Sequence, residues 1–229
     1  MLQSEIIYNL KNLKAGGIQS DDENLADAQM AFIIDYYRAK LLRQQAMKHG
    51  SYNRQLVQDL GKIEVISVDP HECGCPKGGC IIRTKLEIPK TLDLGNGDNH
   101  FFTFVGLYGG IAFQETSWQR APWDFYAKYT GKQPKWFIKG RYIYILNPPD
   151  PLLKWINIQG IFESPKVAIQ FRTCDCPNGQ DCMDLNNFDF EYPMPIYLVD
   201  TLVKMAMEGE MQWSVMDPPD TLNDSLDSN

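Results

Sequence analysis

The sequence lacks the motifs that identify common enzyme classes. Its three histidines, His49, His71 and His100, stand in unrelated contexts, and none belongs to an H-E-x-x-H metal-hydrolase pattern. There is no G-x-S-x-G motif and no glycine-rich phosphate loop. The sequence therefore predicts no catalytic residues and a protein that is not an enzyme.

Long apolar runs are also missing, so no membrane-spanning helix is expected. Met1–Glu5 has neither the basic start nor the apolar centre of an export signal. We therefore expect a soluble protein made in a reducing cytoplasm, where paired cysteines are less often disulfides. With 229 residues, the chain is long enough to build a proper core without them.

Positive charge is scarce in the last third of the chain. Residues 161–229 contain 3 Lys or Arg against 13 Asp or Glu, whereas residues 1–60 contain 7 against 7 and residues 61–160 contain 12 against 9. The net charge of −7 therefore comes almost entirely from the last third. Because binding to phosphates needs the opposite sign, sequence-specific recognition of nucleic acid is disfavoured.

All the cysteines lie in two short stretches, which we call the cysteine knuckles. Both read Cys-x-Cys-Pro, followed by a Gly-containing turn and a third cysteine. The six residues are Cys73, Cys75, Cys80, Cys174, Cys176 and Cys182.

The knuckles are the one candidate metal site. Three thiolates supply most of a tetrahedral zinc shell, with His71 or a cysteine of the other knuckle as the fourth ligand. However, the spacing is not the usual C-x₂-C, and one knuckle has no nearby histidine, so structural zinc is not the favoured reading. Reduced thiols packing a β corner, and disulfides formed after release from the cell, remain open.

The flanks of the two knuckles also correspond. Ile63–Val68 and Val167–Phe171 are β-branched runs before a knuckle, and Leu86–Pro89 and Phe190–Pro193 are alternating runs after one. We therefore predict that a small β unit occurs twice and that the knuckles form its corners.

Helical periodicity dominates the N-terminal part. Ser4–Leu13 places its aliphatic side chains on one side, and Ser20-x-x-Glu23 is a capping box for a helix that nothing interrupts before His49. The apolar residues of this long helix cover more than one face. Burial against the chain's own β part and packing against adjacent subunits both explain this pattern. A further short helix, capped by Gly61, is predicted over Asn53–Leu60.

Period-two patterns begin after Gly61, and turn residues separate them. A short helix is predicted from Pro122 to Tyr129, and Lys139-Gly140-Arg141 marks a hairpin. The predicted strands are Lys62–Asp69, Ile81–Ile88, Phe101–Leu107, Trp136–Lys139, Tyr142–Asn147 and Trp155–Phe162.

A last helix is predicted after Pro195. A stripe at helical spacing is expected to pack in the core: Ile196, Val199, Leu202, Val203 and Ala206. The predicted fold class is α+β: an N-terminal helical hairpin with one long helix, a β-rich body with two knuckles, a C-terminal helix and an acidic tail. The expected divisions are a segment of assembly helices (1–61), the β-rich body with its closing helix (62–212) and a flexible acidic tail (213–229).

Several stretches together resemble a known family over roughly residues 60–210. They are Cys80–Pro89, Phe102–Gly106, Lys128–Thr130, Arg141–Asn147, Trp155–Glu163 and Pro193–Glu210. They are similar to the head-to-tail connector proteins, also called ring or adaptor proteins, of crAss-like tailed phages. Portal-bound adaptors of other short-tailed phages also use an N-terminal helical hairpin.

The resemblance implies a structural protein of the virion, located at the portal vertex and made in the cytoplasm of a bacterial host. It implies a homo-oligomeric ring of twelve copies that contacts the portal and neighbouring tail ring proteins, with DNA passing through its channel. An alternative is a zinc-stabilised interaction module that acts in the infected cell outside the particle.

Overall fold

The structure, a computed structural model, describes most of the chain: residues 1–14, 26–49, 53–69, 81–93, 101–107, 109–124, 126–150, 152–173 and 188–209. The chain forms two compact units, one from residues 1–42 with 186–229 and one from residues 43–185. N-terminal helices, a seven-stranded sheet and a C-terminal helix make the fold α+β, as predicted.

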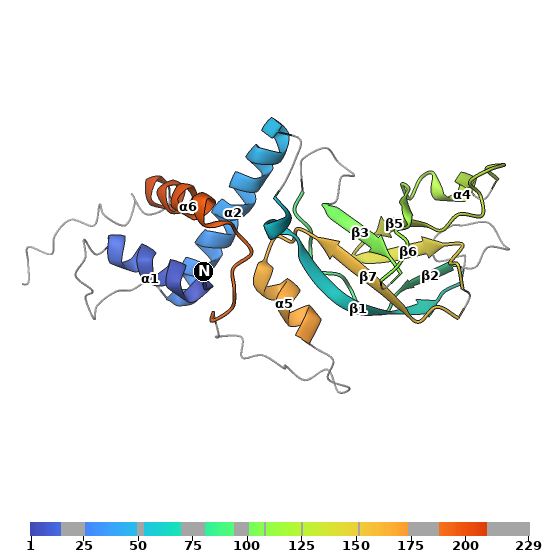
Figure 1. Cartoon of the computed structure of the whole chain (residues 1–229), viewed down its shortest axis with the longest axis horizontal. Helices are drawn as coiled ribbons and strands as arrows, with labels where there is room; N and C mark the ends of the chain where they lie inside the picture. Colours follow the sequence, from blue (N-terminus) through green and yellow to red (C-terminus); the bar gives the residue numbers. More distant parts are fainter. Residues whose placement is uncertain are drawn as a thin grey trace, which may run out of the picture. The chain divides into compact units, whose positions relative to one another are not determined.

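The first unit is helical. It contains α1 (Gln3–Lys14), the first part of α2 (Asp27–His49) and α6 (Ile196–Glu208), and α1 packs on α6 (Figure 1). Gln3 N donates to the carbonyl of Phe190 at 3.1 Å, so the start of α1 is also held by the segment before α6. The unit therefore joins the two ends of the described chain.

The core of this unit follows the predicted helical stripes in part: Leu13 of α1 is 56% exposed, and Val203 of α6 is only partly buried. On α6, Val199, Leu202 and Ala206 are buried as expected, and Leu198 joins them. Ile196 is 72% exposed, so its prediction as a core residue was wrong. It is the first residue of the helix, and the buried side of α6 begins two residues later.

The second unit contains one mixed sheet with the order β3-β7-β1-β2-β6-β5-β4, in which only β4 and β5 pair in parallel (Figure 1). The strands are β1 (Gln58–Ser67), β2 (Ile81–Thr84), β3 (Phe102–Gly106), β4 (Gln114–Glu115), β5 (Lys135–Lys139), β6 (Tyr142–Leu146) and β7 (Trp155–Gly160). All six predicted strands are found, although β2 ends at Thr84 instead of Ile88. The predicted hairpin is also confirmed: Lys139 pairs with Tyr142, and Gly140 has a φ of 66°.

The sheet curls, and its two ends are joined by one stretch of chain. In residues 111–116, which contain β4, the amide of Phe113 donates to the carbonyl of Val105 on β3 at 2.8 Å. The amide of Thr116 donates to the carbonyl of Trp136 on β5, also at 2.8 Å. The same segment thus bonds to both ends of the sheet, as in a closed barrel.

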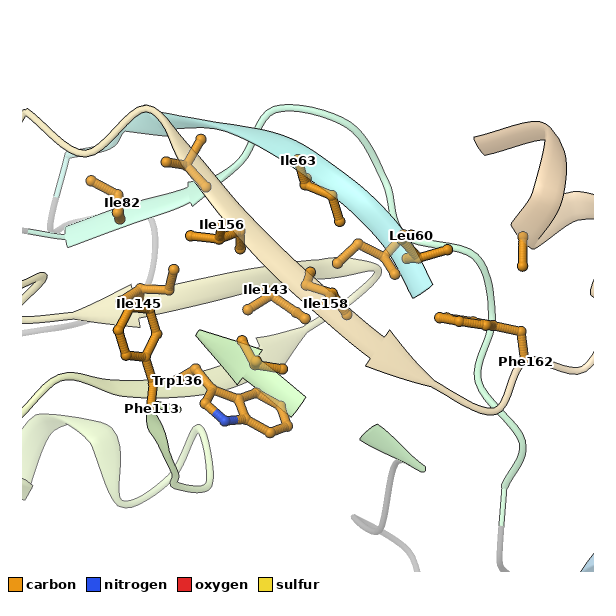
Figure 2. Packing of buried hydrophobic residues seen from close by; sticks show 14 residues of the cluster. Leu60, Ile63, Ile82, Phe113, Trp136, Ile143, Ile145, Ile156, Ile158 and Phe162 are labelled. Atoms are coloured by element: carbon orange, nitrogen blue, oxygen red, sulfur yellow. The ribbon is translucent and has the colours of Figure 1, made fainter. Parts of the chain in front are cut away.

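Alternate residues of the strands fill the inside and cover the outside of this curl. Ile143 and Ile145 of β6 point into the inner core, where side chains of β1, β5 and β7 meet them (Figure 2). Tyr144 of β6 belongs to an outer cluster, where its ring stacks on Phe137 at 5.2 Å and Ala121 is also buried. Both faces of this part of the sheet are therefore apolar and covered.

The predicted helix over Asn53–Leu60 was wrong. Only Arg54–Leu56 is helical, as a 3-10 turn, and β1 begins at Gln58. Gly61 has a φ of 76° and lies at a register shift between β1 and β7, where its amide donates to the Asp59 carboxylate. This glycine therefore forms a β-bulge, whose backbone favours glycine, and does not cap a helix.

The predicted duplication of a β unit was also wrong. Val167–Phe171 lies inside helix α5 (Pro165–Thr173), beside β1 (Figure 1). Pro165 at its first position is a helix-start signal, and Ala168 is buried in the inner core. A strand precedes the first knuckle and a helix precedes the second, so their flanks are not equivalent. The short predicted helix shrinks to α4 (Ala121–Asp124), which is followed by turns.

Candidate functional site

The six knuckle cysteines lie outside the described residues. Structural zinc at these positions therefore stays a prediction. The zinc content of the purified protein and the response of its thermal stability to EDTA would test it. Within the described ranges, no group of three or more His, Cys, Asp or Glu side chains is placed to hold a metal ion.

The segment around α4 presents an unusual surface. Trp123, Tyr126 and Tyr129 are 73%, 74% and 84% exposed, although side chains of this kind are normally at least half covered. We call the exposed aromatic and cationic side chains of this segment the α4 surface: Trp118, Arg120, Trp123, Tyr126, Lys128, Tyr129 and Lys132. Lys128 Nζ lies 5.3 Å from the centre of the Tyr129 ring.

A buried ion pair anchors this segment to the sheet. The carboxylate of Asp124 accepts hydrogen bonds from Lys135 Nζ at 2.9 Å and from Thr116 Oγ1 at 2.5 Å, and the Asp124 and Lys135 side chains are both buried. Burial alone would raise the pKa of Asp124. The two hydrogen bonds and the positive charges of Lys135 and Arg120 lower that pKa below its ordinary value of 3.8. Asp124 is therefore a structural anion and not a proton donor.

Other contacts hold the two ends of the segment. Ala121 is fully buried in the outer cluster, and Asn147 Nδ2 donates to the carbonyl of Gly131 at 2.5 Å. The aromatic side chains thus stay exposed while the backbone that carries them is fixed. Fixed, exposed aromatic groups are typical anchors of protein interfaces, because little conformational entropy is lost when they bind.

A pocket of about 570 Å³ opens beside this surface. Trp118 and Arg120 line it, with the Asp124–Lys135 pair at its wall. Each Trp or Tyr side chain offers roughly 150–250 Å² of contact area, so the exposed parts of these four side chains add up to several hundred Å². Exposed apolar area of this amount within one short segment makes the segment a candidate site of interaction with a partner.

The helical unit contains a second buried polar cluster. Tyr192 donates from its hydroxyl to Asp35 Oδ1 at 2.9 Å, and the fully buried Arg38 guanidinium lies 5.7 Å from the centre of the Tyr192 ring. Burial raises the pKa of Tyr192 well above its ordinary value, and the Asp35 carboxylate raises it further. The phenol stays protonated, so the cluster fixes α2 against the segment before α6 and offers no chemistry.

Helix α2 is apolar on more than its buried side. Met30 and Ile34 are fully buried, whereas Phe32 is 71% and Tyr36 52% exposed. Phe32 and Tyr36 are four residues apart and therefore neighbours on the helix surface. Of the two explanations that the sequence left open, burial against this chain accounts for only one side of α2.

Comparison with family models gives the function class of this molecule. A model of the crAss ring proteins, described as phage tail ring protein 2, matches residues 4–228. The chain belongs to this tail ring family. The resemblance to ring proteins of crAss-like phages, and the prediction that the protein is not an enzyme, are confirmed. A comparison with curated proteins found no match.

As a tail ring protein, the chain is a structural component of a phage tail, so its functional sites are surfaces that bind other proteins. None of the helices in the described part combines the length and apolar character needed to cross a bilayer. Sequence reasoning missed the α4 surface because it treated Pro122–Tyr129 only as a helix. The available signal was composition: residues 117–141 contain six Lys or Arg and one carboxylate, interleaved with aromatic residues.

Proposed function

We propose that the protein forms a closed ring of twelve copies that joins the phage portal to the tail and continues the DNA channel. The match to the tail ring family over residues 4–228 carries this proposal. Rings are built from heterologous contacts that close by rotation, so each copy needs two different binding surfaces. The α4 surface and the exposed side of α2 supply such surfaces in separate parts of the chain.

The charge distribution supports a role around DNA without binding to it. The acidic last third, repeated around a ring, would repel the phosphate backbone and let DNA slide. The N-terminal segment 1–61 is proposed to contribute assembly helices, because Phe32 and Tyr36 leave an apolar strip of α2 uncovered.

Electron microscopy of the purified protein, alone and mixed with portal, tests this function. The expected result is rings with twelvefold symmetry that stack on the portal. A cryo-EM map of the portal vertex of the virion would then place the ring along the tail. A protein that stays monomeric with and without portal would overturn the proposal.

A further inference from the structure

The α4 surface has chemistry complementary to the C-terminal end of the same chain. The only carboxylate in residues 117–141, Asp124, is buried and bonded to Lys135, so the exposed charge of this segment is positive. Residues 210–229 contain five carboxylates and no Lys or Arg. We infer that residues 210–229 of one copy bind the α4 surface of the next copy in the ring. This inference rests on the proposed ring and names one of its contacts.

Residues 217–220 match the aromatic part of the surface as well as its charge. Their sequence is Asp-Pro-Pro-Asp. Proline fixes its own φ and restricts the residue before it, so consecutive prolines favour an extended polyproline backbone. Extended proline segments bind in grooves lined by Trp and Tyr, whose flat faces pack on the proline rings. On the α4 surface, Trp123 and Tyr126 provide exposed rings, and Lys128 and Lys132 provide cations for the flanking carboxylates.

A neighbouring copy fits as the source of this segment because ring contacts are heterologous. Such a contact needs two different patches on each copy, and the α4 surface and residues 210–229 are two different patches. The segment follows Gly209, which ends α6, and twenty extended residues span up to roughly 70 Å.

Nucleic acid is the competing ligand, because cations interleaved with aromatic residues also suit a single strand of DNA. The acidic segment fits better for two reasons. Each copy of the chain carries one α4 surface and one segment 210–229, so the two are present in equal numbers. The net charge of −7 also opposes the approach of DNA at long range.

The first test measures binding of a fluorescent peptide with the sequence of residues 210–229 to the full-length protein by anisotropy. Binding is expected, and Lys132→Glu or Trp123→Ala should weaken it about tenfold or more, as removal of an interface anchor does. Lys154→Glu is the matched control. It makes the same charge change at an exposed lysine directly before β7, outside the α4 surface, and should leave binding unchanged. A peptide with Asp217→Lys and Asp220→Lys should not bind.

The second test identifies which copy supplies the segment. Protein labelled with ¹⁵N is mixed with unlabelled protein and treated with a carbodiimide, which joins carboxylates to lysines without a spacer. Cross-links between Asp217 or Asp220 and Lys128 or Lys132 are expected to pair labelled with unlabelled peptides. Links only within one isotope would assign the contact to a single chain and overturn the inference.

The outcomes separate this contact from the ring itself. A peptide that does not bind protein kept monomeric by dilution, while the same protein forms rings at higher concentration, would overturn the contact and leave the ring intact. A peptide that binds, in a protein that forms no rings with portal, would overturn the ring. Binding of an oligonucleotide that is lost in Lys132→Glu, without binding of the peptide, would assign the surface to nucleic acid instead.

Discussion

Arg38 is completely buried in the helical unit, where burial lowers its pKa. The Tyr192 phenol and the Asp35 carboxylate oppose that shift by stabilising the charged guanidinium. A charge at such a site depends on its partners, because removing one of them leaves the other uncompensated in a low-dielectric interior.

We therefore expect Asp35→Ala to lower the free energy of unfolding by about 3–5 kcal/mol. Tyr192→Phe keeps the ring and loses one hydrogen bond to a charged group, so its cost should be nearer about 1.5 kcal/mol. Urea denaturation measures both. Asp27→Ala is the control, since it removes an ion pair with Lys11 in which the Asp27 side chain is 57% exposed. Equal losses in the two Asp variants would contradict this account.

Asp124 carries the corresponding role beside the α4 surface and makes stability depend on pH. Its pKa is lowered in the folded protein, so the ion pair with Lys135 stabilises fully above the ordinary value of 3.8. That stabilisation is lost as the pH falls through the lowered pKa. Asp124→Asn, which leaves Lys135 buried without its counter-ion, should cost about 3 kcal/mol at neutral pH.

Urea unfolding of wild type and Asp124→Asn at a series of pH values measures this effect. The difference in unfolding free energy should be constant near neutral pH and shrink in acid. A difference that stays the same down to the lowest accessible pH would show that the carboxylate does not act through its charge.

At the scale of elements, the junction between β3 and residues 111–116 has little room. A Cβ at Gly106 would overlap the carbonyl oxygen of Ile111 and lie 2.9 Å from the Cα of Ala112. Both obstacles are backbone atoms of the segment that joins the ends of the sheet, so they cannot rotate away.

Gly106→Ala should therefore cost about 2 kcal/mol, a typical effect of overpacking. Gly110→Ala is the comparison, because the nearest atom to its new Cβ is the side-chain Cβ of Leu107 at 3.2 Å, and its cost should be smaller. Chemical denaturation measures both variants. A Gly106→Ala protein as stable as wild type would mean that the two ends of the sheet are not held at this position.

Substitutions on the buried and exposed sides of helix α2 should affect stability and ring assembly separately. Ile34 is fully buried, so Ile34→Ala should destabilise the protein by about 2–4 kcal/mol. Phe32 is exposed, so Phe32→Ala should change stability by less than about 0.5 kcal/mol and still reduce ring formation. Thermal unfolding and mass photometry provide the two measurements. A Phe32→Ala protein that assembles normally would remove α2 from the proposed contacts.

The spacing of apolar residues predicted the type of most helices and strands correctly. Helical spacing placed α1 and α6, and alternation placed the strands. The strand predicted over Val167–Phe171 was wrong. Its β-branched composition favours a strand, but Pro165 at the start and the burial of Ala168 beside β1 favour a helix. The prediction that Gly61 caps a helix was wrong for a similar reason, since glycine is suited both to a helix end and to a β-bulge.

At the scale of the whole molecule, the sequence predicted the α+β class and the family, but not the curl of the sheet or the α4 surface. Residues 111–113 pair locally with the end of β3, but Gln114 and Glu115 pair with Lys135 and Trp136 of β5, which lie much further along the chain, so no periodicity reveals this second pairing. The α4 surface depends on which aromatic residues stay exposed. Trp136 and Trp123 have the same side chain, but Trp136 is buried in the core and Trp123 is not.

The uneven charge of the molecule gives a prediction for assembly. If the acidic residues 210–229 contact the basic α4 surface of the next copy, ring formation should weaken with added salt, since the Debye length falls from about 10 Å at 0.1 M to about 3 Å at 1 M. Mass photometry after dilution into a series of NaCl concentrations measures the ring fraction. Purely apolar contacts would instead persist or strengthen in high salt.

The stretch 111–116 also bears on how copies of the chain associate. A tail ring brings many copies of one chain together at high local concentration, where an unpaired strand would recruit the same strand of another copy and grow without limit. Here residues 111–113 already bond to the end of β3, and Gln114 and Glu115 already pair with β5. We therefore expect strand addition at these positions to be hindered, so that contacts between side-chain surfaces determine how the copies assemble.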